Sequence, residues 1–175
     1  MGRVSGRHSG IIGVMHTMKN KMFLIKTVLT CCIALFIAYM LINVESFSNV
    51  DIKEVENQIV TTGDLGTMKK SNNMMIKKVF GLNDAEYDGT IYYKGEGAMD
   101  VTELLIIKLN SKDQASSVES AVRKRLDSQI QNFTNYGTNQ LQLLENSVIK
   151  VSGNYFFYVV SENAVQLKDI FSDSI

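Results

Sequence analysis

An apolar segment near the N-terminus constrains this chain more than any other feature. The stretch from Lys26 to Val44 reads KTVLTCCIALFIAYMLINV, and residues 28–42 within it contain no charge, no glycine and no proline. With the apolar residues 22–25, the segment reaches about 20 residues, roughly the length that spans a hydrocarbon core of about 30 Å as a helix. We therefore predict a transmembrane helix at residues 27–44.

Charged residues are distributed unequally around this segment. The charges that precede it are all basic, whereas acidic residues predominate directly after it. By the positive-inside rule, residues 1–26 form a basic cytoplasmic N-terminus, 27–44 a signal-anchor and 45–175 an extracytoplasmic domain. We thus expect a single-pass protein of the cell membrane, with its N-terminus cytoplasmic and its C-terminal domain extracellular. The basic residues are Arg3, Arg7, Lys19, Lys21 and Lys26, and the acidic ones are Glu45, Asp51, Glu54 and Glu56.

Two adjacent cysteines, Cys31 and Cys32, lie inside the apolar segment. A bacterial lipid-anchor signal needs a small residue before the modified cysteine and an apolar core that ends there, but Thr30 precedes Cys31 and the apolar run continues to Ile42. A redox pair needs an accessible, electropositive setting, which a lipid-facing helix does not offer. We interpret both cysteines as apolar side chains of the anchor. Cleavage stays an alternative, because residues 44–46 (Val-Glu-Ser) form a passable small-x-small site.

The region from residue 45 onward is acidic and lacks several catalytic residue types. It carries 13 of the 18 basic residues and all 18 acidic ones, which gives a net charge of −5 and disfavours nucleic acid as a partner. Both cysteines and both histidines, His8 and His16, precede it. This excludes an internal disulfide, Ser-His-Asp and Cys-His catalysis, and zinc held by His or Cys. The functions that remain possible for this region are catalysis by carboxylates or lysines, calcium binding by carboxylates, and ligand binding. We expect no cofactor and assign no catalytic residue.

Apolar periodicity in this region predicts an α+β fold. Helical spacing is strongest from Ala115 to Phe133, and Ser152-Gly153-Asn154 predicts a tight hairpin in which Gly153 and Asn154 can adopt positive φ. The order is hairpin-helix-hairpin-helix, so we predict one antiparallel sheet of about four strands with helices packed on one face. The other expected elements are helices near 50–62, 73–82, 141–145 and 164–171, and strands around 92–93, 104–109 and on both sides of the hairpin turn.

Four segments of this region carry a resemblance to a known family. They are the strand IIKL, the helix and turn from Val118 to Gly137, the stretch LLENSVIKV and the hairpin GNYFFYVVS. Over about Asp51 to Phe171 the chain resembles an uncharacterised exported, membrane-anchored domain-of-unknown-function family of Clostridia-type Gram-positive bacteria. The resemblance implies a place in the cell envelope but no reaction, cofactor or catalytic residue. Many members carry a lipid-anchor cysteine, and their context suggests an accessory role in polysaccharide O-acylation.

One polar stripe is a candidate binding site. Arg125, Gln129 and Asn132 recur at spacings of four and three on the long helix, and Tyr136 follows just beyond. Arginine offers a planar fork and tyrosine a stacking face, so these four residues could bind a carboxylate, a phosphate or a sugar. Alternatively, the stripe is solvated, or Arg125 pairs with an acid while Tyr136 closes the turn by packing.

A second candidate is the acidic loop from Asp84 to Ile91. Asp84, Glu86, Asp88 and Gly89 match positions 1, 3, 5 and 6 of a calcium loop, but position 12 is Gly95 instead of a bidentate acid. We therefore predict a solvated turn and no metal site. The separated carboxylates Glu103, Glu119 and Glu145 give no acid/base pair that the sequence can place.

The aromatic run from Tyr155 to Tyr158 alternates between the two sides of a strand. If the second face of the sheet were open, it would present aromatic side chains, with Tyr92 or Tyr93, to a glycan or a protein. The favoured interpretation is that helices cover one face and that the other is merely amphipathic. The sequence as a whole predicts a non-enzymatic, membrane-anchored binding or accessory domain with an envelope protein or glycan as partner. The alternative is a carboxylate-dependent envelope hydrolase or transferase, which two acids in a cleft near Arg125 would favour.

Overall fold

The computed structural model describes residues 8–42 and 47–175, with side chains at 23–40 and 47–175. It divides the chain into two units, Met1–Glu45 and Ser46–Ile175, each treated below by itself. Residues 44–46, where cleavage stayed an alternative, and the basic residues Arg3 and Arg7 lie outside the described residues.

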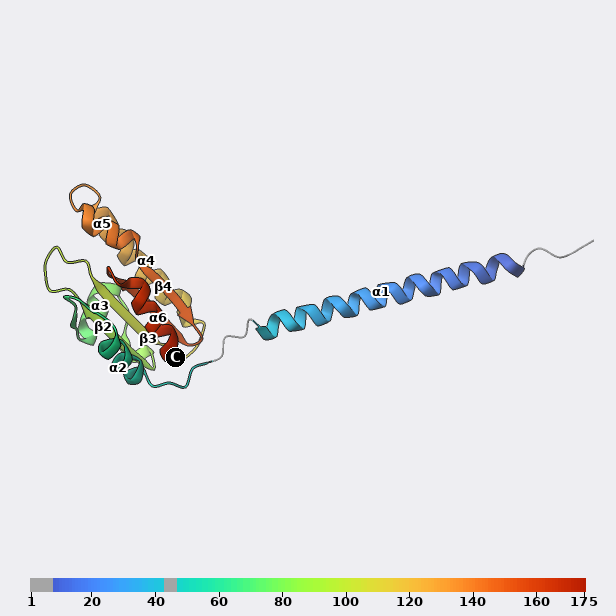
Figure 1. Cartoon of the computed structure of the whole chain (residues 1–175), viewed down its shortest axis with the longest axis horizontal. Helices are drawn as coiled ribbons and strands as arrows, with labels where there is room; N and C mark the ends of the chain where they lie inside the picture. Colours follow the sequence, from blue (N-terminus) through green and yellow to red (C-terminus); the bar gives the residue numbers. More distant parts are fainter. Residues whose placement is uncertain (1–7, 43–46) are drawn as a thin grey trace, which may run out of the picture. The chain divides into compact units, whose positions relative to one another are not determined.

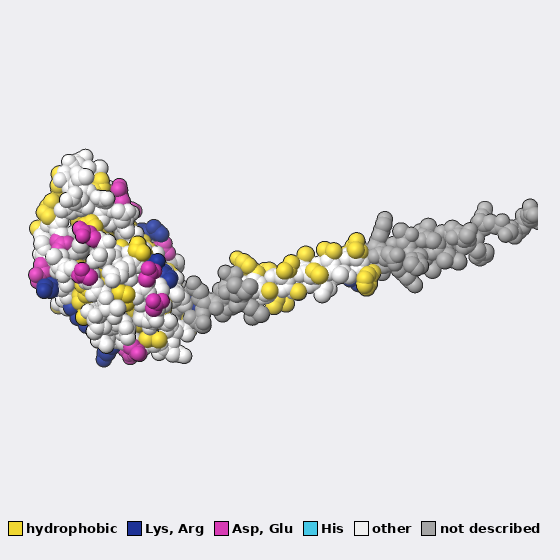
Figure 2. All heavy atoms as spheres, viewed as in Figure 1, with side chains coloured by type: hydrophobic (Ala, Val, Ile, Leu, Met, Phe, Trp, Pro, Cys, Tyr) yellow, Lys and Arg dark blue, Asp and Glu magenta, His cyan; other side chains and the backbone are white. Residues whose placement is uncertain are grey.

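The described residues of the first unit form one helix, α1, from His8 to Ile42. Its window Phe23–Met40 has a mean hydropathy of 2.1, and the side chains there are exposed, as the apolar band along the helix in Figure 2 shows. The hydroxyls of Thr27 and Thr30 donate to carbonyls four residues earlier, at 3.0 and 2.8 Å. The helix thus satisfies these polar groups internally and is long and apolar enough to be a membrane span or a signal anchor.

The second unit is built on one antiparallel sheet in the order β1-β2-β3-β5-β4. The prediction of an α+β fold is confirmed, with five strands against the expected four. The additional strand, β1, is only Lys69–Lys70, too short to show any alternation. The others are β2 (Gly89–Lys94), β3 (Glu103–Lys108), β4 (Val148–Ser152) and β5 (Tyr155–Val160).

Helices cover both faces of the sheet, and the prediction that they pack on one face is wrong. On one face lie α2 (Ile52–Thr62) and α6 (Ala164–Ser174); on the other lie α3 (Asn73–Phe80), α4 (Gln114–Phe133) and α5 (Thr138–Glu145), an arrangement visible in Figure 1. A 3₁₀ turn, Asp84–Glu86, precedes β2. The reason lies in the central strands: all six residues of β5 are buried, so neither face can be left in water. The aromatic run therefore presents no open face.

Local signals set the ends of several elements. Asp51 caps α2 by accepting a hydrogen bond from the N–H of Lys53, at 2.8 Å. Gly81 ends α3 with a φ of +74°, which a residue with a Cβ adopts only with strain. At the β4–β5 turn Gly153 alone has positive φ (+59°), the pattern of a type II′ turn, so Asn154 does not adopt the positive φ that the sequence allowed.

The side chain of Asn154 has another role, because it forms hydrogen bonds with the segment that enters the domain. The amide of Asn154 accepts from the N–H of Ser48 at 2.8 Å and donates to the Ser48 carbonyl at 3.3 Å. Tyr155 donates its hydroxyl to the carbonyl of Val50 at 2.7 Å. The chain therefore enters the second unit beside the β4–β5 turn, at the end of the sheet where β5 begins.

Candidate functional site

A buried carboxylate lies on the face of the sheet that α3 and α4 cover. Glu103, the first residue of β3, is 2% exposed. Its Oε2 accepts the hydroxyl of Tyr92 and its Oε1 the hydroxyl of Tyr158, each at 2.9 Å. Sheet register explains the convergence, because both tyrosines are cross-strand partners of Leu105, which lies two residues from Glu103 on the same face. Each carboxylate oxygen thus has a donor inside the core.

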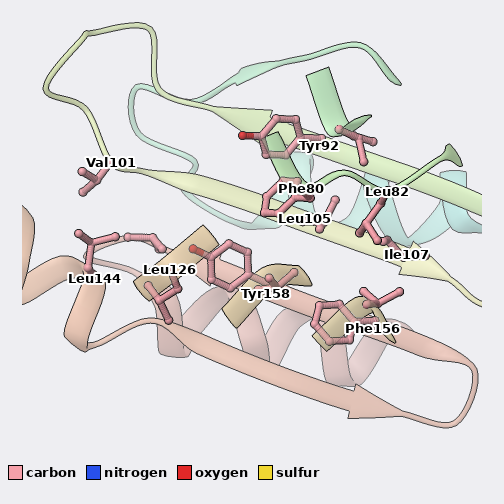
Figure 3. Close-up of a cluster of buried hydrophobic side chains, with 14 of the residues drawn as sticks. Phe80, Leu82, Tyr92, Val101, Leu105, Ile107, Leu126, Leu144, Phe156 and Tyr158 are labelled. Atoms are coloured by element: carbon pink, nitrogen blue, oxygen red, sulfur yellow. The ribbon is translucent and has the colours of Figure 1, made fainter. Parts of the chain in front are cut away.

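The two tyrosines are fixed by the packing around them. Phe80, at the end of α3, makes edge contacts with Tyr92 and Tyr158, with ring centroids 5.3 and 6.3 Å apart. Figure 3 shows Phe80 near both rings and the two hydroxyls directed toward the same end of the sheet. Burial, and then the charge of Glu103, raise the pKa of both tyrosines well above 10. They consequently stay neutral and act as donors.

Arg125 on α4 supplies the cation nearest to this carboxylate. Its Nε lies 3.5 Å from Oε1 of Glu103, and its side chain is 30% exposed. The Nε atom itself is buried and makes no hydrogen bond to any described residue. The two groups therefore form an ion pair without a hydrogen bond, and Arg125 keeps donor capacity that the core does not use.

Arg125 also reaches the surface, at a hollow of about 310 Å³ between α3 and α4. None of the residues that line this hollow is acidic, so it is not the two-acid cleft that would favour carboxylate catalysis. A larger hollow of about 730 Å³ lies along the outer side of α4, but only residues of that helix line it, and one helix cannot enclose a ligand. The smaller hollow is lined by Val79, Phe80, Gly81, Ala121, Lys124, Arg125 and Ser128.

Most of the second unit matches a known family model. The family DUF4358, described as a domain of unknown function, matches residues 61–161. The chain belongs to the DUF4358 family. No curated protein and no solved structure matches the chain. The match confirms the domain of unknown function expected from the sequence, and it includes Glu103, both tyrosines and Arg125.

The DUF4358 domain separates the four residues of the predicted polar stripe. Arg125 and Gln129 turn toward the sheet, and Gln129 is only 8% exposed. Asn132 is exposed, and Tyr136 is 67% exposed with its ring 5.6 Å from that of Phe133. The structure therefore brings two of the four into the core side of α4 and leaves the other two in solvent.

In the sequence, Glu103 is only one of several separated carboxylates. The available signal was its alternation with Leu105 and Ile107, which places the carboxylate on an apolar face of β3. The other two carboxylates differ: Glu119 pairs with Arg123 on the surface at 2.6 Å, and Glu145 is exposed. Of the three, only Glu103 belongs to a buried polar cluster.

All three carboxylates of the acidic loop before β2 have protein partners. Glu86 accepts a hydrogen bond from the side chain of Asn83 at 3.4 Å. Asp88 forms an ion pair with Lys108 at 3.0 Å, and Asp84 accepts a hydrogen bond from the side chain of Asn73. The backbone carbonyl of Glu86 accepts from the side chains of Asn110 and Gln114. These contacts tie the loop of the DUF4358 domain to α3, β3 and α4.

Proposed function

We propose that the protein is a membrane-tethered, extracytoplasmic binding or accessory domain of a Gram-positive cell envelope, without catalytic activity of its own. The observation that carries the proposal is the exposed apolar helix placed directly before a domain whose sheet is covered on both faces. Such a helix anchors a chain in lipid, and the asymmetry of the flanking charges favours export of the domain that follows.

Binding is better supported than carboxylate catalysis. A general acid or base must reach its substrate, whereas both oxygens of Glu103 are engaged by tyrosines in the core. The hollow beside it contains Arg125, Lys124 and Ser128 and no acid. This combination suits recognition of an anionic group, a carboxylate or a phosphate, on an envelope partner. The exposed Asn132 and Tyr136 extend the candidate surface along α4.

Protease protection tests the topology. Protease added to intact protoplasts should digest residues 47–175 and leave a tag on the cytoplasmic N-terminus intact, because the basic flank stays inside. Lysed protoplasts serve as the control in which both parts are digested. A domain that resists protease until the cells are lysed would refute export.

A crosslinking experiment tests the binding surface. A photo-reactive residue at Ser128, in the hollow, should capture an envelope partner in cells that express the full chain. Arg125→Gln should reduce this capture, because the hollow loses its fork of donors, while Arg123→Gln, a matched change outside the hollow on the same helix, should not. Equal capture by both variants, with circular dichroism unchanged, would remove Arg125 from the binding surface.

A further inference from the structure

A third hollow, of about 370 Å³, lies between α5 and the turn that joins β5 to α6. Ser161 follows the last residue of β5, whereas the entering segment is fastened beside Tyr155, the first. Six residues of strand span about 20 Å, so the hollow and the entry segment lie at opposite ends of the sheet. In Figure 1, α5 lies at the upper end of this unit. The hollow is lined by Asn139, Gln142, Leu143, Asn146, Ser161 and Glu162.

Side-chain amides dominate this lining. Asn139, Gln142 and Asn146 follow one another along one side of α5 and its end, and all three are exposed. Within the described part of the chain, no hydrogen bond involves their side-chain amides. Each amide offers two donor hydrogens and an acceptor oxygen, so the hollow presents both kinds of group over a short distance.

The other lining residues narrow the class of ligand. No lysine or arginine lines the hollow, so it lacks the charge that would hold a phosphate. Glu162 is the one acid, too few for a hard cation, which takes six or more oxygen ligands. Leu143 is the one large apolar residue, whereas protein partners usually require aromatic or arginine anchors. What remains is a neutral ligand rich in hydroxyl groups, each of which both donates and accepts.

We propose that this hollow binds a neutral glycan segment, with Asn139, Gln142 and Asn146 as its principal hydrogen-bonding residues. The proposal rests on the proposed function to the extent that export gives the domain access to envelope glycans. It is independent of Arg125 and of the anionic group assigned to the α3–α4 hollow.

The test is ligand-observed NMR on the full chain in phospholipid nanodiscs, which avoid sugar-based detergents. The probes are three neutral tetrasaccharides, built from N-acetylglucosamine, glucose and galactose. At least one should bind with a Kd of about 1 mM or tighter. Asn139→Ala/Gln142→Ala should weaken that binding at least about tenfold, since each lost hydrogen bond contributes roughly a factor of five. Asn57→Ala/Gln131→Ala, which removes two exposed amides elsewhere, should leave it unchanged.

Two results would overturn the proposal. One is that none of the three tetrasaccharides binds; the other is that the Asn139→Ala/Gln142→Ala variant, at unchanged circular dichroism, binds as well as the unchanged protein. Arg125→Lys should not alter tetrasaccharide binding. A loss of binding in that variant alone would assign the sugar to the α3–α4 hollow. Protease protection and crosslinking at Ser128 report on the proposed function separately. A failure of glycan binding is therefore distinguishable from a failure of the tether or of the Arg125 surface.

Discussion

At the scale of single residues, the stability of the DUF4358 domain depends on how the buried carboxylate of Glu103 is hydrogen-bonded and neutralised. A buried carboxylate is costly unless its oxygens are hydrogen-bonded and its charge is balanced. Tyr92 and Tyr158 supply the hydrogen bonds, and Arg125 supplies a positive charge at 3.5 Å. The sequence allowed Arg125 an acidic partner but did not identify that partner, because Glu103 and Arg125 lie on different elements.

Arg125→Ala should therefore cost more than the loss of a surface ion pair. It leaves Glu103 buried without a nearby cation, but the 30% exposure of Arg125 and the absent hydrogen bond reduce the effect to about 1–2 kcal/mol. Arg123→Ala, which breaks only the exposed pair with Glu119, should cost less than about 0.5 kcal/mol. Urea denaturation of the two variants measures the difference, and equal losses would contradict the buried pair.

Alkaline pH should destabilise the domain through the same tyrosines. Because burial and Glu103 raise their pKa in the folded state, the folded protein keeps protons that the unfolded chain releases near pH 10. This contribution to stability is fully present below about pH 10 and is lost as the pH rises above it. Urea midpoints at about pH 8 and about pH 11 should show the drop, and Tyr92→Phe/Tyr158→Phe should make it smaller. Some drop should persist, since the pKa values of Tyr93 and Tyr155 are raised as well. An unchanged drop in the double variant would contradict the assignment.

At the scale of elements, α4 holds the structural and the candidate functional residues on neighbouring positions. Val118, Val122 and Leu126 are buried against the sheet at the spacings that predicted the helix. Arg125 lies beside Leu126 but borders the α3–α4 hollow. A single helix thus holds the core together and presents the proposed binding surface.

Leu126→Ala should lower the free energy of unfolding by roughly 2–5 kcal/mol, because it removes buried methyl groups and leaves a cavity. Lys124→Ala, an exposed position on the same helix, should change it by less than about 0.5 kcal/mol. Thermal or urea unfolding monitored by circular dichroism measures both. A loss below about 1 kcal/mol for Leu126→Ala would show that α4 is not packed as described.

At the scale of the whole molecule, the proposed role requires that α1 holds the protein in the membrane. Cys31 and Cys32 are free cysteines in the exposed apolar window of that helix. If the helix is the anchor, then Cys31→Ser/Cys32→Ser should leave the protein in the membrane fraction, because two hydroxyls remove little of the apolar surface. Fractionation followed by carbonate extraction provides the measurement. Release of the variant into the medium would instead indicate that a lipid attached to one of these cysteines anchors the protein.

The sequence by itself determined the apolar N-terminal segment, the order of the main helices and strands, and the presence of a domain of unknown function, because each of these follows from local sequence patterns. Helical spacing between Ala115 and Phe133 and the glycine of the β4–β5 turn are local signals of this kind. Only the tertiary structure decided that helices cover both faces of the sheet and that Glu103 is buried beside Arg125. The physical reason is distance along the chain: Tyr158, which donates to Glu103, lies 55 residues away, and only the pairing of β3 with β5 brings the two together. The same pairing buries both sides of the central strands, so their environment depends on partners that no local pattern specifies.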